Sequence, residues 1–175
     1  MSAKNWLLVG GVAGFLGVVL GAFGAHGIKQ TLPEWYDTDD LAKPSMSEKT
    51  GKEDPPTPGW YQLDRLRQKK LETWMTGVRY HFYHTFAILM IGLLTLSQNQ
   101  PISRCLNIAG WFFVLGIFGF SGSIYLLVIT KIPILGMAAA VGGVILLGGW
   151  VFFFLGVFYL VIPQNQNPAS YGVQT

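Results

Sequence analysis

The chain has 175 residues, of which 51% are hydrophobic, 14% aromatic and 12% charged, against roughly a quarter charged residues in a soluble domain. This composition excludes a soluble globular protein and indicates an integral membrane protein. The net charge of +3 does not indicate a nucleic-acid partner, because most basic residues are interleaved with acidic ones in a single loop. The single cysteine, Cys105, excludes an intramolecular disulfide and a cysteine-based metal cluster within one chain.

Residues 6–28 form the first predicted membrane span. This segment holds no charged residue, and at about 1.5 Å rise per residue it is long enough to cross a hydrocarbon core of about 30 Å. Glycines recur in it at spacings of four, three, four and three: Gly10, Gly14, Gly17, Gly21 and Gly24. The spacing places them in one stripe of the helix, which predicts close packing against a neighbouring membrane helix.

A polar stretch over residues 29–71 follows, and together with Glu72 it holds every acidic residue of the chain. Its prolines and charged residues predict a solvated loop. Near its end, residues 60–72 combine apolar residues at near-helical spacing with basic ones. This part fits either a short basic amphipathic helix at the membrane surface or a solvated lead-in to the next span.

Three further apolar segments, over 74–97, 106–130 and 135–162, predict the remaining spans. Pro133 separates the third span from the fourth, because proline cannot continue a helical hydrogen-bond ladder. The fourth span carries glycines at intervals of seven, which predicts a second close-packing face: Gly142, Gly149 and Gly156. We therefore expect one membrane domain over 1–175, an all-α polytopic four-helix bundle.

Two segments of the chain resemble each other. Val19–Gly27 and Val114–Gly122 agree at six of nine positions, and both spans would cross the membrane in the same direction. One hypothesis is that the bundle consists of two duplicated helical hairpins, the parallel kind of repeat found in some transporters. Chance agreement between glycine-rich apolar segments is the alternative.

Four spans place both termini on the same side of the membrane. The two loops on the opposite side carry most of the basic residues, so the positive-inside rule predicts that loop 29–71 is cytoplasmic and that both termini lie outside.

Polar side chains concentrate in the half of the membrane that faces this loop, and we predict that they gather into one cluster: His26, Tyr80, His84, Ser121, Ser123 and Tyr125. Ionisable residues within a bilayer are candidates for function, but histidine, serine and tyrosine also hydrogen-bond across membrane helices. A packing cluster, a ligand or proton site, and metal or haem ligation by His81 and His84 all stay open. No span contains a carboxylate, so neither a catalytic residue nor a metal site is predicted.

Four motifs of the chain are similar to those of a known family. They are Gly21–Gly27, Trp74–Tyr80 continuing to His84, Phe120–Leu126, and Val141–Gly143 followed by Gly149 and Trp150. The chain resembles domain of unknown function family 423, also called uncharacterised protein family 0382, which consists of small bacterial membrane proteins related to eukaryotic transmembrane protein 256.

This resemblance implies a four-helix integral membrane protein without an established activity. The family's motif positions include the whole predicted polar cluster. Members typically have glutamine where this chain has His81, which argues against a two-histidine metal site. Their first loop is usually shorter, so part of loop 29–71 is an insertion.

We expect a non-enzymatic membrane protein without a cofactor, acting as a structural or accessory component of a membrane complex. It would lie in the cytoplasmic, or inner, membrane of a bacterium, in contact with the lipid bilayer and with a membrane protein partner or a second copy. The alternative is a small-solute or proton transporter, or a channel-like protein, with a polar recess around His26 and His84.

Overall fold

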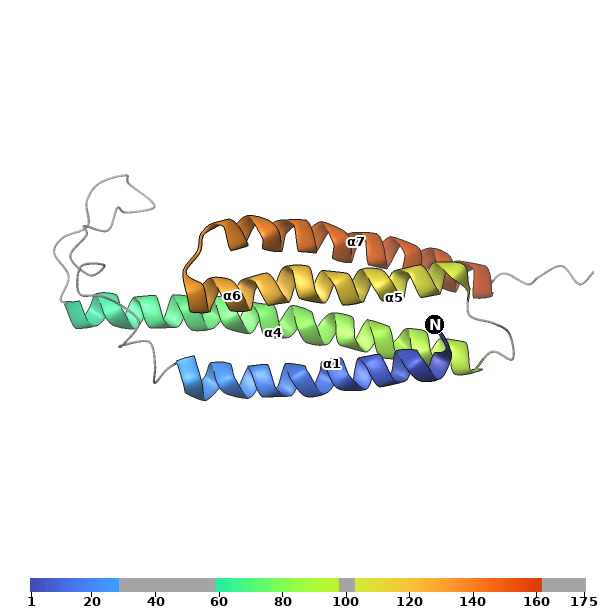
Figure 1. The fold of residues 1–175 in the computed structure, drawn as a ribbon, viewed down its shortest axis with the longest axis horizontal. Helices are drawn as coiled ribbons and strands as arrows, with labels where there is room; N and C mark the ends of the chain where they lie inside the picture. The colour runs from blue at the N-terminus through green and yellow to red at the C-terminus, as the bar shows by residue number, and fades with distance from the viewer. Residues whose placement is uncertain (29–58, 98–102, 162–175) are drawn as a thin grey trace, which may run out of the picture.

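The computed structural model describes residues 1–28, 59–97 and 103–161, and the described residues contain helices but no strand. The helices are α1 (Ala3–Phe23), η1 (Gly24–Ile28), α4 (Gly59–Ser97), α5 (Arg104–Gly116), η2 (Ile117–Gly122), α6 (Ser123–Thr130) and α7 (Ile134–Val161). The π-helical turn η1 continues α1, and the π-helical segment η2 joins α5 to α6, so that the chain forms four long helical rods (Figure 1).

All four rods are long and apolar enough to cross a membrane: Ala3–Gly27, Leu63–Ser97, Arg104–Thr130 and Ile134–Leu160. The predicted fold class, an all-α bundle with four membrane spans, is confirmed. The predicted spans 6–28, 74–97 and 106–130 lie inside the observed helices, and the fourth, 135–162, extends one residue beyond the described part. Most of the predicted loop, residues 29–58, also lies outside the described residues.

The segment 60–72 is the first part of α4 and not a separate helix. The 39 residues of α4 form one continuous helix, which extends past the ends of α1 and α6 (Figure 1). Leu63, Leu66 and Leu71 fall among Arg, Gln and Lys residues of good helix propensity, and no proline interrupts them. Continuation into the second span is therefore the locally favoured conformation.

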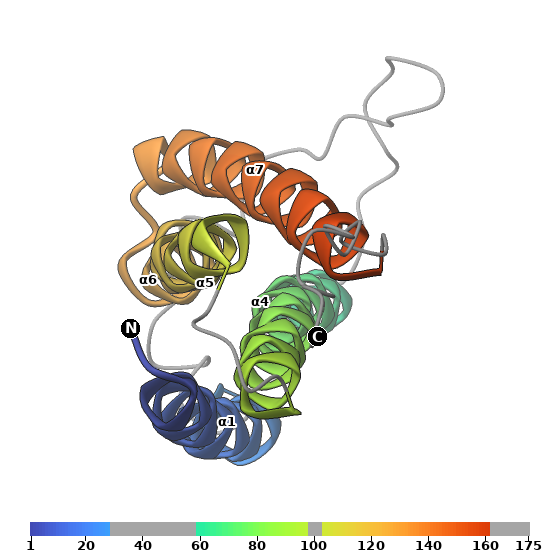
Figure 2. The ribbon, with the colours of Figure 1, turned by 90° about the vertical axis from the view of Figure 1, so that its right-hand side faces the viewer.

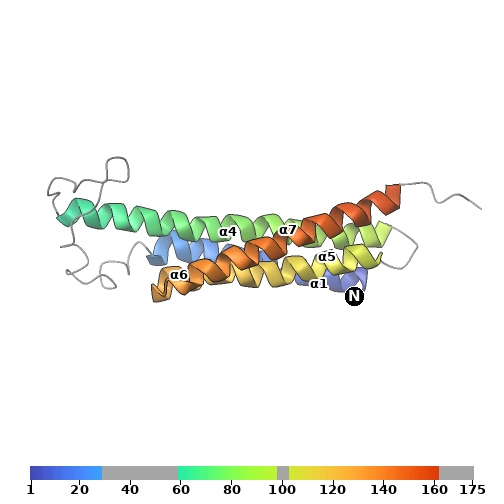
Figure 3. The same ribbon diagram turned by 90° about the horizontal axis from the view of Figure 1, so that it is seen from above.

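The rods pair as two antiparallel hairpins, α1 with α4 and α5–η2–α6 with α7, as the end view shows (Figure 2). Helix α7 crosses the bundle obliquely (Figure 3), and α4 also contacts α5, η2 and α6. One buried cluster includes Trp6, Ile88, Leu106 and Phe113. A second cluster, nearer the end where α1 and α6 stop, consists of Trp74, Val78, Tyr125 and Val128.

The glycine stripe of α1 faces α4, as its spacing predicts. A Cβ added at Gly17 would lie 3.0 Å from the Phe82 ring, and one at Gly14 would lie 3.6 Å from Thr85. The other members face Leu89, Val78 and Trp74 in turn: Gly10, Gly21 and Gly24. In α7, Gly149 faces Phe113, and Gly142 lies directly against the backbone of Gly119 and Phe120. Small residues thus set the distance between helices in both hairpins.

The two similar segments occupy corresponding places in the two hairpins. Gly21 faces Val78 and its counterpart Gly116 faces Leu146, while Gly24 faces Trp74 and its counterpart Gly119 faces Gly142. Val78 and Leu146, the two residues faced by the first pair of glycines, are separated by the same number of residues as Trp74 and Gly142, which are faced by the second pair. The helices of the two hairpins are therefore paired in the same register. Each segment also ends in π-helical residues, Gly24–Gly27 of η1 and Ile117–Gly122 of η2. These shared features favour duplication over chance.

Candidate functional site

The buried histidine His81 connects α4 to two neighbouring rods. Its side chain is 4% exposed. The Nε2–H donates to the carbonyl oxygen of Ala13 in α1 at 2.9 Å. The Tyr125 hydroxyl in α6 donates to His81 Nδ1 over a longer distance, 3.5 Å. A helix backbone carbonyl can accept a second hydrogen bond because it has two lone pairs, so this contact leaves the α1 ladder intact.

The second buried histidine, His84, connects α4 to the remaining rod. Its Nδ1–H donates to the carbonyl oxygen of Tyr80, one turn back in the same helix, at 2.7 Å. The indole N–H of Trp150 in α7 donates to His84 Nε2 at 3.2 Å. The imidazole also packs against Phe113, with ring centroids 5.6 Å apart.

The hydrogen-bond partners decide which nitrogen of each imidazole carries the proton. An indole N–H can only donate and a carbonyl oxygen can only accept, so His84 is assigned as the neutral Nδ1–H form and His81 as the Nε2–H form. All four ring nitrogens then have a partner within the protein. Two histidines on one helix therefore join α4 to every other rod of the bundle.

The structure brings most of the predicted cluster to the interfaces around α4. Ser121, Ser123 and Tyr125 are buried together with His84. Tyr80 is 42% exposed, and its ring packs against Phe120 with centroids 4.7 Å apart. The hydroxyl oxygen of Ser121 has no hydrogen-bond partner within the described residues.

His26 does not join this cluster. It lies in η1, with its side chain exposed. Gly24 faces Trp74, and His84 lies ten residues further along α4, about 15 Å away along the axis. The sequence placed His26 in the correct half of the bundle, but it lies too close to the end of its helix to reach His84.

His81 is the residue that the sequence argument undervalued. The family resemblance argued against His81 as a metal ligand, and His81 was not included in the predicted cluster. In the structure it nevertheless forms a hydrogen bond with Tyr125, a member of that cluster. Its place in the sequence held the signal, because Gly77, His81 and His84 recur at spacings of four and three on the buried side of α4. Glutamine, the residue that the family resemblance implies at this position, can also donate to a carbonyl.

An apolar groove of about 400 Å³ lies between α1 and the α5–η2–α6 rod. Its walls include Leu8, Val12 and Leu16 from α1, and Val114 and Phe118 from the opposite rod. His81 and Tyr125 also contribute to the lining. Their polar atoms bond to each other and to Ala13, so the groove suits hydrocarbon and not a hydrated solute.

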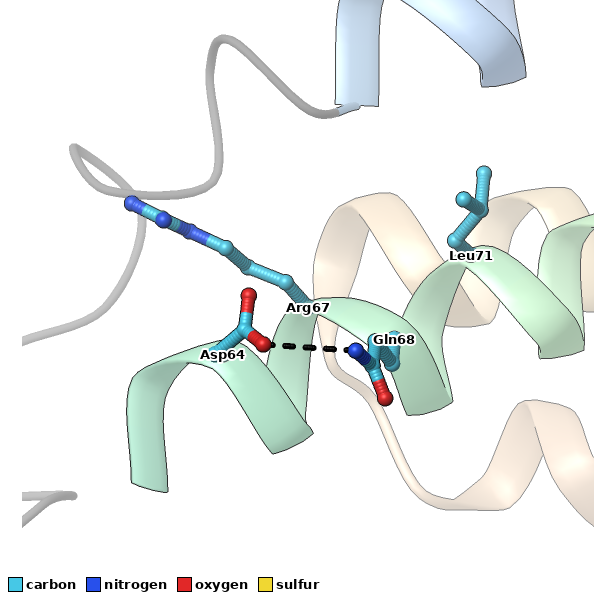
Figure 4. Close-up of a pocket in the computed structure, with 4 residues that line it drawn as sticks. All are labelled: Asp64, Arg67, Gln68 and Leu71. Carbon is cyan, nitrogen blue, oxygen red and sulfur yellow. Dashed lines mark hydrogen bonds between the residues drawn. The ribbon is translucent and has the colours of Figure 1, made fainter. Parts of the chain in front are cut away.

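A second hollow of about 410 Å³ lies beside the start of α4, where Asp64, Arg67, Gln68 and Leu71 line it. Figure 4 shows Arg67 extending away from the helix while Gln68 donates to the Asp64 carboxylate at 3.2 Å. Within the described ranges, no three His, Cys, Asp or Glu side chains lie close enough together to hold a metal ion. The described residues that line the two hollows therefore include no group of three such metal ligands.

Comparison with known proteins gives one consistent answer. Residues 57–143 match the family model described as "Protein of unknown function (DUF423)". The UPF0382 membrane protein YwdK of Bacillus subtilis (strain 168) is 31% identical over 150 residues, which cover 85% of this chain and 91% of YwdK. This chain belongs to the DUF423/UPF0382 family.

Other members of the family show similar agreement. The UPF0382 membrane protein SAB0533 of Staphylococcus aureus (strain bovine RF122 / ET3-1) is 29% identical over 155 residues, covering 89% of this chain and 96% of that protein. SH2409 of Staphylococcus haemolyticus (strain JCSC1435) is 28% identical over 158 residues, covering 90% and 98%. No solved structure matches. The suspected family is thus confirmed, and its members are membrane proteins whose names assign no activity.

Proposed function

We propose that this UPF0382 protein is a non-enzymatic structural or accessory component of a membrane complex, and that α1 faces the partner. Residues on the outer side of α1 recur at spacings of three and four: Leu8, Gly11, Phe15, Val18 and Ala22. Such spacing is that of a helix seam. Its large members are largely uncovered, with Leu8 68% and Phe15 69% exposed.

The small residues of this stripe carry the proposal. A Cβ added at Gly11 would meet nothing within 4 Å, so this glycine has no packing role inside the bundle. In lipid, small residues on a helix surface favour the close approach of another helix. Helix α7, the other outer rod, also has a glycine that faces open space, Gly136, but near its start. Further along, its exposed surface carries bulky residues, which is typical of a surface that faces lipid: Val144, Leu147, Val151, Phe154 and Phe158.

The polar cluster supports a structural role for the bundle itself. Each ring nitrogen of His81 and His84 bonds to another group of the protein, so neither of these two imidazoles has a nitrogen open to a substrate. Hydrogen bonds of this kind between membrane helices hold a bundle together.

The proposal places the protein in the bacterial cytoplasmic membrane, with the α6–α7 turn and the start of α4 on the cytoplasmic side. The positive-inside rule supports this orientation, because Lys69, Lys70 and Lys131 all lie at that end of the bundle.

The alternative is a small-solute or proton transporter, or a channel-like protein. The observation that favours it is the Ser121 hydroxyl, which is buried at 1% exposure without a partner in the described part of the chain. An unpartnered buried hydroxyl is costly and could serve a passing solute.

The native mass of the full chain in a mild-detergent extract of its own membranes tests the proposal. We expect it to migrate with other chains, which mass spectrometry would identify, and Gly11→Leu to release it at a lower mass. Gly136→Leu on α7 is the matched control, because a Cβ there also meets nothing within 4 Å, and it should migrate as the wild type does. Migration of the wild type as a monomer or small homo-oligomer would contradict the proposal and favour the transporter.

A further inference from the structure

Arg79 lies on the exposed face of α4, inside the level at which the neighbouring rods end. Trp74 marks that level, because it packs beside Gly24 of η1 and in one cluster with Val128 of α6. Arg79 is five residues further into the bundle, about 7.5 Å along the helix axis. The backbone of Arg79 therefore lies in the membrane-embedded part of α4. Its side chain extends back, so that the guanidinium reaches towards the membrane surface, as arginine does near the ends of membrane helices.

No carboxylate neutralises Arg79 among the residues that the structure describes. Its Nη2 donates to the Thr76 hydroxyl at 3.1 Å, and the same hydroxyl donates to the Glu72 carbonyl at 2.9 Å. The Glu72 carboxylate, two turns before Arg79, makes no salt bridge with it within the described residues. Thr76 thus orients the guanidinium and leaves most of its five donors free for an external anion.

Tyr83 lies one turn deeper than Arg79 on the same exposed face, and its side chain is 56% exposed. Its hydroxyl has no partner in the described part of the protein, although a polar group in lipid needs one. Beyond it the exposed face becomes apolar at Phe86 and Met90. Along this face a basic side chain, a phenol hydroxyl and apolar side chains thus follow one another from Arg79 to Met90. The phosphate, glycerol and acyl chains of a phospholipid follow one another in the same order.

The charge at this end of the bundle favours an anionic lipid. Between Gly59 and Arg79, α4 carries five basic side chains against two acidic ones. Lys70 in addition is half-buried and experiences electrostatic repulsion from Lys131, which follows α6, and from Lys69. An anionic headgroup relieves this repulsion, and such basic segments attract anionic lipids.

We propose that Arg79 and Tyr83 bind the phosphate of an anionic phospholipid in the leaflet next to the start of α4, with an acyl chain along Phe86 and Met90. The site lies on α4, apart from the α1 surface, and does not depend on the accessory role proposed above.

Lipid retention tests this site. The full chain would be reconstituted in phosphatidylcholine containing phosphatidylglycerol and then extracted in mild detergent, and native mass spectrometry would count bound phosphatidylglycerol. Arg79→Gln should lower the retained fraction by about tenfold, the effect of losing one hydrogen bond to a charged group. Tyr83→Phe should give a smaller loss. Arg104→Gln, an exposed arginine at the opposite end of the bundle, should retain lipid as the wild type does.

Two further measurements show whether a loss of bound lipid comes from the site itself, from misfolding of the variant, or from a general attraction of anions. In pure phosphatidylcholine, Arg79→Gln should unfold near the wild-type temperature, because the hydrogen bond from Arg79 to Thr76 is exposed and its loss leaves no buried polar atom without a partner. Phosphatidylglycerol should raise the unfolding temperature of the wild type, and inorganic phosphate should not. Equal lipid retention by the wild type and Arg79→Gln, an equal loss in Arg104→Gln, or equal protection by inorganic phosphate would each overturn the proposal.

Discussion

At the scale of single residues, the polar cluster consists of hydrogen bonds that each fix one helix against another. His84 shows this most clearly, because its Nδ1–H donates within α4 and its Nε2 accepts from Trp150 of α7. A charged imidazolium would present a second N–H to the indole N–H. The neutral form of His84 is therefore part of the helix contact itself.

Trp150→Phe tests the importance of this contact. The change keeps an aromatic ring but leaves the buried His84 Nε2 without its donor, so we expect a loss of roughly 1–3 kcal/mol in the free energy of unfolding. Thermal unfolding in detergent measures it. Trp111→Phe is the matched control, because Trp111 packs on Trp6 at a centroid distance of 5.8 Å but donates no hydrogen bond within the described residues. Equal losses in both variants would contradict the structural role of the bond.

At this scale the sequence predicted which residues would be buried near α4, but not which pairs would form. Spacing on a helix gives the face of His81 and His84. It does not give the rotation of α1 and α7, which brings Ala13 to one imidazole and Trp150 to the other. Trp150 belongs to one of the motifs on which the family resemblance rests, yet nothing in its own surroundings in the sequence indicates a histidine partner.

At the scale of elements, glycine contacts determine how closely the rods pack. In the second hairpin one such contact is formed by backbone on both sides, where Gly142 of α7 meets Gly119 and Phe120 in η2. Because backbone atoms cannot turn aside as a side chain can, this contact tolerates no added methyl group.

Gly142→Ala should therefore separate α7 from η2 and cost about 1–3 kcal/mol, as overpacking does in other close-packed interfaces. Gly136→Ala, in the same helix, faces open space and should stabilise the protein by up to about 1 kcal/mol through helix propensity. Unfolding temperatures of the two variants check the opposite signs. A neutral Gly142→Ala would show that the two helices can move apart without loss.

The elements themselves were predictable because apolar runs of this length with at most one charged residue have few alternatives to a membrane helix. The π-helical turns were not, since glycine and apolar residues fit α and π geometry alike. The continuity of α4 was left open because a basic segment with interspersed leucines suits both a surface helix and a straight extension. Packing of Trp74 against Tyr125, with centroids 4.6 Å apart, fixes the direction of α4 at this point.

At the scale of the whole molecule, the four rods place the N-terminal end of α1 and the α6–α7 turn at opposite ends of the bundle (Figure 1). Asn5 and Ile132 are exposed at these two ends. Neither is charged, so changing them leaves the charge distribution that governs insertion unaltered.

Cysteine labelling measures the orientation. In a Cys105→Ala background, which removes the single native thiol, Asn5→Cys should react with an impermeant maleimide on intact cells. Ile132→Cys should react only after the membrane is opened, because the basic end is cytoplasmic. The reverse pattern would refute the orientation and keep the four spans. Labelling of both from the same side would refute the span count.

The length of α4 has a mechanical consequence. From Trp74 back to Gly59 the helix runs 15 residues past the level where its neighbours end, about 22 Å along its axis. The chain therefore leaves the bundle at two heights, near its surface at Ile28 and at the tip of a stiff stalk at Gly59. A protein that bound this tip would be held at a fixed distance from the bilayer. A sideways force on the tip would act first on the packing of Trp74 against Tyr125 at the base of this extension.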